Sequence, residues 1–192
     1  MVNELIQILK LMIGHNAESF SINHISKLRS INYKTAYLNV KRLEKLKLIK
    51  AEKLGNTTNC TFSFKNHPLV YDAEILRRDE FLVKNSRMAV LYNQLLKVKN
   101  PLFCALLFGS YAKGKQTKAS DIDLAVISSD ELFEQVRKEI SILPLKLHLL
   151  QFTPEEFASS LRTTEFNVCH EIKKNNIVMF GTESYYEVLR HA

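Results

Sequence analysis

The chain has 192 residues, of which 46% are hydrophobic and 24% charged, and its formal net charge is +7. This length holds one ordinary domain or two small ones, and no apolar run is long enough to span a bilayer, so a membrane protein is excluded and a cytoplasmic one is expected. Three widely spaced cysteines, Cys60, Cys104 and Cys169, exclude a disulfide framework and a Cys-x-x-Cys zinc site, and they predict reduced thiols.

Three short helices are expected at the start of the chain. Ser21 is a good N-cap for the second helix and Asn32 for the third, because their side chains can accept a hydrogen bond from the first helical turn. In the third helix, Ala36 and Val40 are expected to face the core. The first helix is predicted from apolar residues that recur at helical spacing, namely Val2, Leu5, Ile6, Leu9, Met12 and Ile13.

Two short strands are expected next. Residues 49–53 and 58–64 flank the pair Gly55-Asn56, which favours a tight turn, so these runs are predicted to form a hairpin. The positive charge lies in the same part of the chain. Residues 1–67 carry 11 Lys and Arg against 4 Asp and Glu, whereas residues 68–192 carry 16 of each. A basic module beside a neutral one is typical of a nucleic-acid-binding domain joined to another domain, with an idle basic surface as the alternative.

Three helices followed by a hairpin resemble a winged helix-turn-helix domain, with residues 33–45 as its recognition helix. The resemblance implies that this helix enters the major groove of DNA with its first residues at the base edges. It gives these DNA-binding candidates: Tyr33, Lys34, Thr35 and Tyr37 at bases, and Lys41 and Arg42 at phosphates. Winged helices also serve as protein-protein or dimerisation modules, so a protein partner or a homodimer stays open.

Two further helices, over residues 69–84 and 86–98, are expected to connect this domain to the rest of the chain. No internal repeat or low-complexity segment interrupts them. We therefore expect three parts, a winged helix-turn-helix domain over residues 1–67, a helical linker over 68–100 and a further domain over 101–192.

The further domain is organised around two apolar runs and the residues between them. Residues 103–108 predict a buried strand that ends at Gly109-Ser110, and Asp121-Ile122-Asp123 opens a second strand. Residues i and i+2 of a strand point to the same face, so the two aspartates present paired carboxylates, which suit Mg²⁺ or Mn²⁺. Gly109 permits close backbone approach, and Ser110 begins a helical turn whose amide groups can hold a phosphate. These features predict a metal-nucleotide site, with two strands and a solvated loop as the alternative.

Helices and strands alternate through the remaining residues. The expected helices cover residues 130–140, 165–174 and 182–189, and the expected strands cover 143–152 and 177–180. Thr153-Pro154-Glu155-Glu156 is typical of a helix start, since it combines a cap, a first-turn proline and a glutamate three residues after the cap.

The Gly-Ser pair and the Asp-x-Asp strand together resemble the active-site motif of the DNA polymerase β-like nucleotidyltransferase superfamily, in particular of its minimal prokaryotic members. The resemblance implies an α/β (α+β) fold with a mixed β-sheet flanked by helices. It also implies transfer of a nucleoside monophosphate from a nucleoside triphosphate such as ATP, with Mg²⁺ (or Mn²⁺) on Asp121 and Asp123. Gly109 and Ser110 are then the nucleotide-binding residues. Minimal members often act as antitoxins that modify a tyrosine of a partner toxin, and others modify small molecules.

Three lysines, Lys113, Lys115 and Lys118, lie between the phosphate end and the metal end of this motif. Lys113, beside Gly114, is the candidate for contact with the triphosphate. The alternative is that all three belong to a solvated loop.

Active members of the superfamily carry a third carboxylate on the strand that precedes the helix begun by Thr153. The matching position is His148, in Leu147-His148-Leu149. Leucines at 143, 145, 147 and 149 alternate inward, which places Lys146 and His148 on the opposite face. His148 could bind metal, act as a general base, or simply pack, so a working enzyme, a slow enzyme and a nucleotide-binding fold without turnover all stay open.

The favoured interpretation is a cytoplasmic nucleotidyltransferase that modifies an unidentified acceptor, for which a protein hydroxyl is one candidate, and that binds DNA through the winged helix. The alternative is a DNA-binding transcriptional regulator whose nucleotidyltransferase fold is weak or inactive. The missing third carboxylate favours the second interpretation, and the complete Gly-Ser and Asp-x-Asp motifs favour the first.

Overall fold

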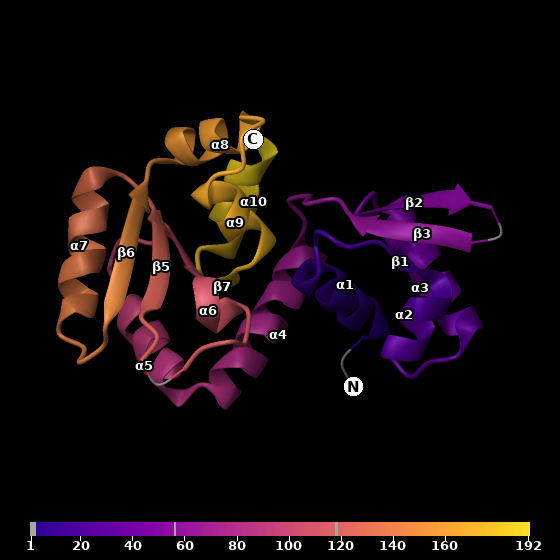
Figure 1. The fold of residues 1–192 in the computed structure, drawn as a ribbon, viewed down its shortest axis with the longest axis horizontal. Helices are drawn as coiled ribbons and strands as arrows, with labels where there is room; N and C mark the ends of the chain where they lie inside the picture. The colour runs from indigo at the N-terminus through magenta and orange to yellow at the C-terminus, as the bar shows by residue number, and fades with distance from the viewer. Residues whose placement is uncertain (1–2, 56, 118) are drawn as a thin grey trace. The chain divides into compact units, whose positions relative to one another are not determined.

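The computed structural model of the chain describes residues 3–55, 57–117 and 119–192 (Figure 1). Val2, Asn56 and Lys118, which were named above, lie outside these ranges. The described residues form two compact units that divide between Leu76 and Arg77. This division falls within the helix α4 (Pro68–Lys84), which starts where the predicted winged-helix range ends. Within the described ranges, none of the helices has both the length and the apolar character of a membrane span.

The described part of the first unit contains three whole helices, the first residues of α4 and a three-stranded antiparallel sheet. The helices are α1 (Glu4–Gly14), α2 (Ile22–Leu28) and α3 (Tyr33–Lys45). The strands are β1 (Phe20–Ser21), β2 (Ile49–Leu54) and β3 (Thr57–Phe62), in the order β1-β3-β2. The predicted helices and hairpin are present. The sequence does not predict β1, because two residues are too few to show a strand pattern.

Polar side chains determine where the second and third helices begin. The hydroxyl oxygen of Ser21 accepts a hydrogen bond from the amide of His24 at 3.1 Å. The side-chain oxygen of Asn32 accepts one from the amide of Thr35 at 2.8 Å. Both predicted N-caps are therefore confirmed, and the one at Asn32 fixes the first turn of α3.

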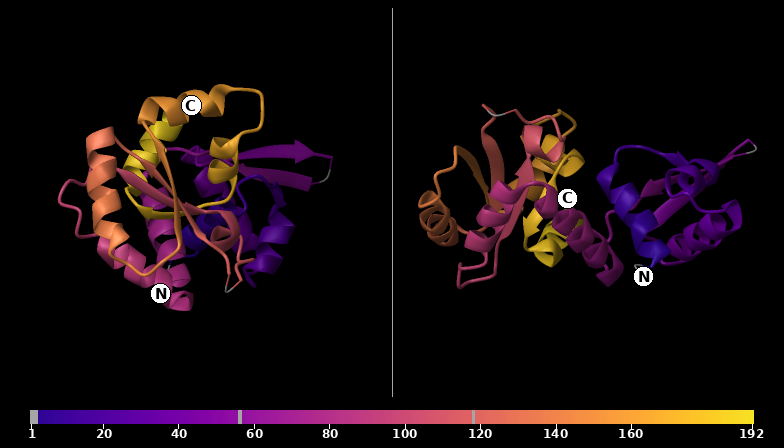
Figure 2. Two further views of the ribbon diagram at one scale, coloured as in Figure 1. Left: turned by 60° about the vertical axis from the view of Figure 1, so that its left-hand side comes forward. Right: turned by 90° about the horizontal axis from the view of Figure 1, so that it is seen from below.

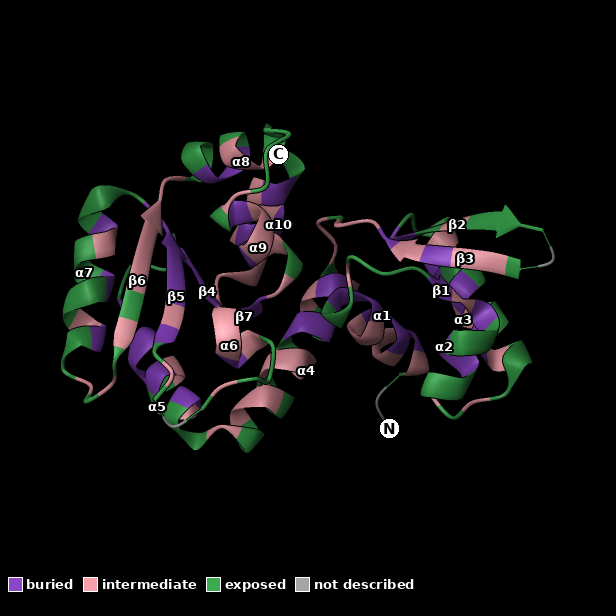
Figure 3. Cartoon of the chain, in the orientation of Figure 1, coloured by how far each residue is buried: buried purple, intermediate pink, exposed green. Residues whose placement is uncertain are grey.

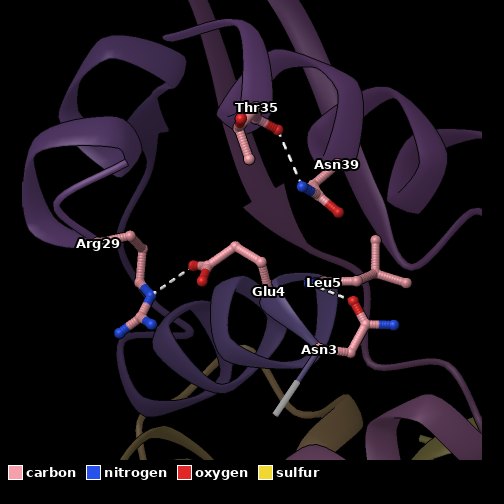
Figure 4. A network of polar contacts seen from close by, with 6 residues as sticks. All are labelled: Asn3, Glu4, Leu5, Arg29, Thr35 and Asn39. Atoms are coloured by element: carbon pink, nitrogen blue, oxygen red, sulfur yellow. Dashed lines mark hydrogen bonds and ion pairs between the residues drawn. The ribbon is translucent and has the colours of Figure 1, made fainter. Parts of the chain in front are cut away.

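The core of the first unit lies between its helices and its sheet (Figure 3). Its fully buried apolar residues include Leu5, Ile8, Leu9, Met12, Ile25, Val40, Leu43 and Leu48. Polar contacts that lie outside this core also support the helices. Arg29 Nε donates to Glu4 Oε1 at 2.9 Å and joins the end of α2 to the start of α1, and Asn39 donates to the carbonyl oxygen of Thr35 within α3 (Figure 4).

The second unit is built on a four-stranded mixed sheet. Its strands are β4 (Cys104–Phe108), β5 (Ile122–Ile127), β6 (Leu147–Phe152) and β7 (Ile177–Phe180). They lie in the order β6-β5-β4-β7, with β4 antiparallel to both of its neighbours and β5 parallel to β6. The predicted mixed sheet flanked by helices is therefore present.

Helices cover both faces of this sheet (Figures 1 and 2). One face carries α5 (Ser86–Leu95) and α7 (Asp130–Ser141), and the other carries α8 (Pro154–Arg162), α9 (Val168–Lys174) and α10 (Thr182–Arg190). A buried apolar cluster fills the space under α5 and α7. It includes Met88, Leu91, Leu107, Leu124, Val126, Val136 and Ile140.

The strand predicted over residues 143–152 is shorter in the structure. β6 begins at Leu147 because this residue pairs with Ile122, so the ladder starts where β5 starts. Pro144, which has no amide hydrogen, also disfavours strand pairing upstream. The predicted alternation is confirmed, since the four leucines at 143, 145, 147 and 149 pack against the buried cluster and His148 is exposed.

The helix start predicted at Thr153 is also confirmed. The hydroxyl oxygen of Thr153 accepts a hydrogen bond from the amide of Glu156 at 3.2 Å, and the amide of Thr153 donates to the Glu156 carboxylate at 2.8 Å. This reciprocal capping box fixes where α8 leaves the end of β6.

Candidate active site

The antiparallel pairing of β4 with β5 brings the Gly-Ser pair and the Asp-x-Asp motif together. β4 is buried throughout and leads into Gly109, whose φ of +68° lies in the left-handed region. Phe108 pairs with Asp123 across the ladder. A Cβ atom on Gly109 would consequently lie only 2.1 Å from Oδ2 of Asp123. Position 109 therefore requires glycine for two reasons. Its backbone conformation is left-handed, and the Asp123 carboxylate occupies the space that a side chain would need.

A single helical turn, α6 (Gly109–Ala112), begins at this junction. Ser110 is its half-buried second residue, so the helical turn predicted there is present. The first amide groups of a helix have no carbonyl partner within that helix. The start of α6 therefore presents backbone donors at the same end of β4 as the Asp123 carboxylate.

The two aspartates of the motif have different surroundings. Asp123 lies within β5 and its side chain is 26% exposed, whereas Asp121 is exposed and precedes the strand. Ile122 and Leu124 are buried in the cluster under α5 and α7. Because neighbouring strand residues point to opposite faces, Asp123 is directed away from that cluster and towards the other face of the sheet.

His148 lies directly beside Asp123. The two residues are partners in the parallel ladder of β5 and β6, and His148 Nδ1 is 3.0 Å from Asp123 Oδ1. An ionised carboxylate can only accept a hydrogen bond, so Nδ1 is the donor in this contact. The His148 side chain is 60% exposed. His148, which the sequence predicts at the position of the third carboxylate, is thus in contact with the second aspartate of the motif.

The carboxylate and imidazole groups here suit a divalent cation, and Gly109 leaves the room that the Asp123 carboxylate needs. The fit is incomplete, however. Among the described residues, no group of three or more His, Cys, Asp or Glu side chains gathers closely enough to hold a metal ion. Asp121, Asp123 and His148 therefore do not form a three-ligand cage as their side chains stand.

Lys113, the predicted triphosphate contact, forms an ion pair that the sequence does not predict. Its Nζ lies 2.6 Å from Glu171 Oε1, and Asn175 also donates to that carboxylate oxygen, at 3.3 Å. In the same loop, Gln116 donates to Asn85 Oδ1 at 3.3 Å. Glu171 and Asn85 come from α9 and from the junction of α4 with α5, far from this loop in sequence, so no local pattern could have indicated them.

The exposed surface of α3 carries the residues predicted to bind DNA. Tyr33, Lys34, Tyr37, Lys41 and Arg42 are exposed, and Thr35 is half-buried. The rings of Tyr33 and Tyr37 stack with their centroids 6.3 Å apart. Lys41 donates to Glu44 at 2.7 Å, and this hydrogen bond raises the pKa of Lys41. An anion that binds Lys41 must therefore compete with Glu44.

A comparison with protein families finds one match, and it lies within the second unit. The family model for the polymerase beta nucleotidyltransferase domain matches residues 92–185, a range that includes all the candidate residues from Gly109 to His148. A search of curated proteins found no match. The family match supports placing this part of the chain in the polymerase β-like nucleotidyltransferase superfamily, and it supports a nucleotidyl transfer activity in general.

Proposed function

We propose that the chain transfers a nucleoside monophosphate from a nucleoside triphosphate to an acceptor hydroxyl, and that it binds DNA through its first unit. Residues 92–185 match a nucleotidyltransferase family, which supports a nucleoside triphosphate as substrate. The observation that carries the proposal is the contact between the two motifs, because Gly109 lacks the one atom that would collide with the Asp123 carboxylate.

In this proposal, each residue near that contact has a role. Asp121 and Asp123 hold Mg²⁺ (or Mn²⁺), and the amide groups at the start of α6, with Gly109 and Ser110, bind phosphate oxygens. The cation, when bound, stabilises negative charge on the transferring phosphoryl group. His148 orients the Asp123 carboxylate through the 3.0 Å contact.

Lys113 is proposed to bind the triphosphate by exchanging partners. It now lies 2.6 Å from Glu171, and both side chains are partly exposed. An exposed ion pair of this kind contributes only about 0–1 kcal/mol, so the more highly charged triphosphate can displace the carboxylate. Glu171 then keeps the lysine close to α6 when no nucleotide is bound.

The first unit is proposed to be a winged helix-turn-helix domain over residues 1–67, joined by residues 68–100 to a nucleotidyltransferase domain over 101–192. The support is the order of three helices and a hairpin, and an exposed basic and aromatic surface on α3. Tyr33, Lys34, Thr35 and Tyr37 would meet bases, and Lys41 and Arg42 would meet phosphates. In this proposal the protein is cytoplasmic. Its nucleotidyltransferase domain modifies a partner protein, as an antitoxin does, and its winged helix regulates transcription. Homodimer formation through the first unit is compatible with this arrangement.

A second function has one specific observation in its favour. The three-carboxylate site is incomplete, because His148 stands beside Asp123 and no three-ligand group forms among the described residues. The chain would then be a DNA-binding transcriptional regulator whose second unit binds nucleotide without turnover.

One experiment separates the two functions. The purified protein is incubated with cell extract, Mg²⁺ or Mn²⁺, and each of the four nucleoside triphosphates labelled at the α-phosphate. Transfer of label that is lost in Asp121→Ala/Asp123→Ala, and kept in the control Asp79→Ala on the exposed surface of α4, establishes the enzyme. Nucleotide binding without transfer in either metal favours the regulator.

A further inference from the structure

We infer that Asp123 and His148 form a mixed carboxylate-imidazole metal site, and that this site selects a first-row transition cation over Mg²⁺. The inference rests on the proposed function, since it concerns the cation of that site. It adds His148 as a metal ligand, beyond the two aspartates of the motif.

The first argument is the register of the two strands. Asp123 and His148 are paired in the parallel ladder of β5 and β6, so their side chains leave the sheet on the same face and at the same level. Asp123 is further constrained by Gly109, whose missing Cβ leaves the space for its carboxylate. Backbone pairing therefore fixes the two side chains beside each other without any contribution from a metal.

The second argument is the distance between the two side chains. His148 Nδ1 and Asp123 Oδ1 are 3.0 Å apart. Two ligand atoms that each lie about 2.1 Å from one cation, at right angles to one another, are separated by about 3.0 Å. A cation can therefore replace the hydrogen bond at this same separation, and the imidazole ring turns so that the Nδ1 lone pair points at the cation and no longer at Asp123. The proton on Nδ1 moves to Nε2 through solvent, so the neutral ring keeps one proton and Nδ1 gains a lone pair for the metal.

The third argument concerns the chemical nature of the ligands. Mg²⁺ prefers oxygen ligands, whereas imidazole nitrogen suits transition cations. Replacing a third carboxylate by a neutral imidazole also removes one negative charge from the site, which weakens the attraction for every divalent cation. The nitrogen ligand offsets this loss for a transition cation and not for Mg²⁺. The pair therefore discriminates between the two classes of cation.

The test measures metal binding directly, with Mn²⁺ alone as the probe and no nucleotide present. Free Mn²⁺ is counted by its electron paramagnetic resonance signal, and Mg²⁺ affinity is obtained by competition. Pulsed resonance on the bound Mn²⁺ then reports whether a ¹⁴N nucleus is directly coordinated. We expect nitrogen coupling in the wild type and at least a tenfold preference for Mn²⁺ over Mg²⁺.

Three variants make the test specific. His148→Asn keeps an N–H group that can donate to Asp123 but offers no imidazole nitrogen, so it separates a metal ligand from a hydrogen-bond partner. It is expected to lose the nitrogen coupling and to bind Mn²⁺ at least about tenfold more weakly, with Mg²⁺ affinity changed less than about threefold. His148→Asp is expected to reverse the preference. His191→Asn is the matched control, because its side chain is 62% exposed against 60% for His148, and it should leave both affinities unchanged.

The outcomes keep this inference separate from the proposed function. Absence of Mn²⁺ binding, absence of nitrogen coupling, or an unchanged Mn²⁺ affinity in His148→Asn would each overturn the inference. Label transfer that depends on Asp121 and Asp123 would still support the proposed enzyme in those cases. Nitrogen coupling without label transfer from any nucleotide would support the inference and contradict the proposed nucleotidyl transfer activity.

Discussion

Gly109 and Asp123 fit together only because position 109 has no side chain: a Cβ there would lie 2.1 Å from Oδ2 of Asp123 and 3.0 Å from its Cγ. Gly114, which follows α6, provides a close comparison. Its φ of +65° is nearly that of Gly109, yet no atom lies within 4 Å of the position of its Cβ. The two glycines therefore separate the energetic effect of the backbone conformation from that of the collision.

Gly109→Ala should lower the free energy of unfolding by more than Gly114→Ala does. Both substitutions place alanine in the left-handed region, which costs about 1–2 kcal/mol. Only Gly109→Ala adds the collision, for which overpacking typically costs about 1–3 kcal/mol more. Urea unfolding followed by circular dichroism measures both. Equal losses would show that the Asp123 carboxylate simply moves aside.

The exchange of partners proposed for Lys113 predicts opposite effects of two substitutions. Lys113→Gln should weaken binding of a nucleoside triphosphate about tenfold, because it removes a charge-assisted contact with phosphate. Glu171→Gln should strengthen this binding, because it removes the carboxylate that competes for Lys113 at 2.6 Å. Isothermal titration with a non-hydrolysable triphosphate gives both affinities. Lys115→Gln, in the same loop, is the control, and a loss of affinity in Glu171→Gln would mean that Glu171 positions Lys113 instead of competing for it.

DNA binding by α3 should depend on salt and on a small set of cations. Arg42→Ala should weaken binding to all sequences and reduce the slope of log affinity against log salt by about 1. Glu44→Gln should strengthen binding, because it releases Lys41 from the 2.7 Å ion pair. Gel shifts at several salt concentrations test both, with Lys138→Ala on α7 as the control. Affinity that does not respond to salt or to these variants would favour a protein partner for this surface.

The buried cysteines predict how stability changes at alkaline pH. Burial raises the pKa of the Cys60 thiol to about 11 and that of the Cys104 thiol to about 12, from an ordinary value of 9.0. These thiols ionise first in the unfolded chain, so their contribution to stability is complete below pH 9.0 and decreases as the pH rises towards 11 and 12.

Cys104→Ala should therefore show a shallower decline in the free energy of unfolding above pH 9.0 than the wild type does. Urea unfolding at several pH values measures this decline. A slope identical to that of the wild type would contradict the prediction. Because Cys60, Cys104 and Cys169 are all free and buried, they should also react with a thiol reagent only after unfolding.

Sequence patterns predict this fold well where the physical signal is local. The caps at Ser21, Asn32 and Thr153 are confirmed because a cap depends on a few neighbouring residues. The position of His148 could be predicted for a similar reason. Alternating leucines fix which face a strand residue occupies, and the helix start at Thr153 fixes where the strand ends.

Features that depend on distant residues could not be predicted in this way. β6 begins at Leu147 and not at Leu143 because its partner β5 begins at Ile122, which no pattern within residues 143–152 reveals. The placement of β7 beside β4 depends on tertiary packing. The ion pair of Lys113 with Glu171 likewise forms only when α9 packs against the sheet.

The most direct test of the central claim, nucleotidyl transfer at Asp123, is the rate of label transfer from an α-labelled nucleoside triphosphate in a single variant. Asp123→Asn keeps the size of the side chain and removes its charge, so any loss reflects the carboxylate itself. We predict transfer by the wild type, with Mg²⁺ or Mn²⁺, that falls at least about a hundredfold in Asp123→Asn and is unchanged in Asp79→Asn. Transfer that persists in Asp123→Asn, or no transfer by a wild-type protein that binds the nucleotide, would contradict this account.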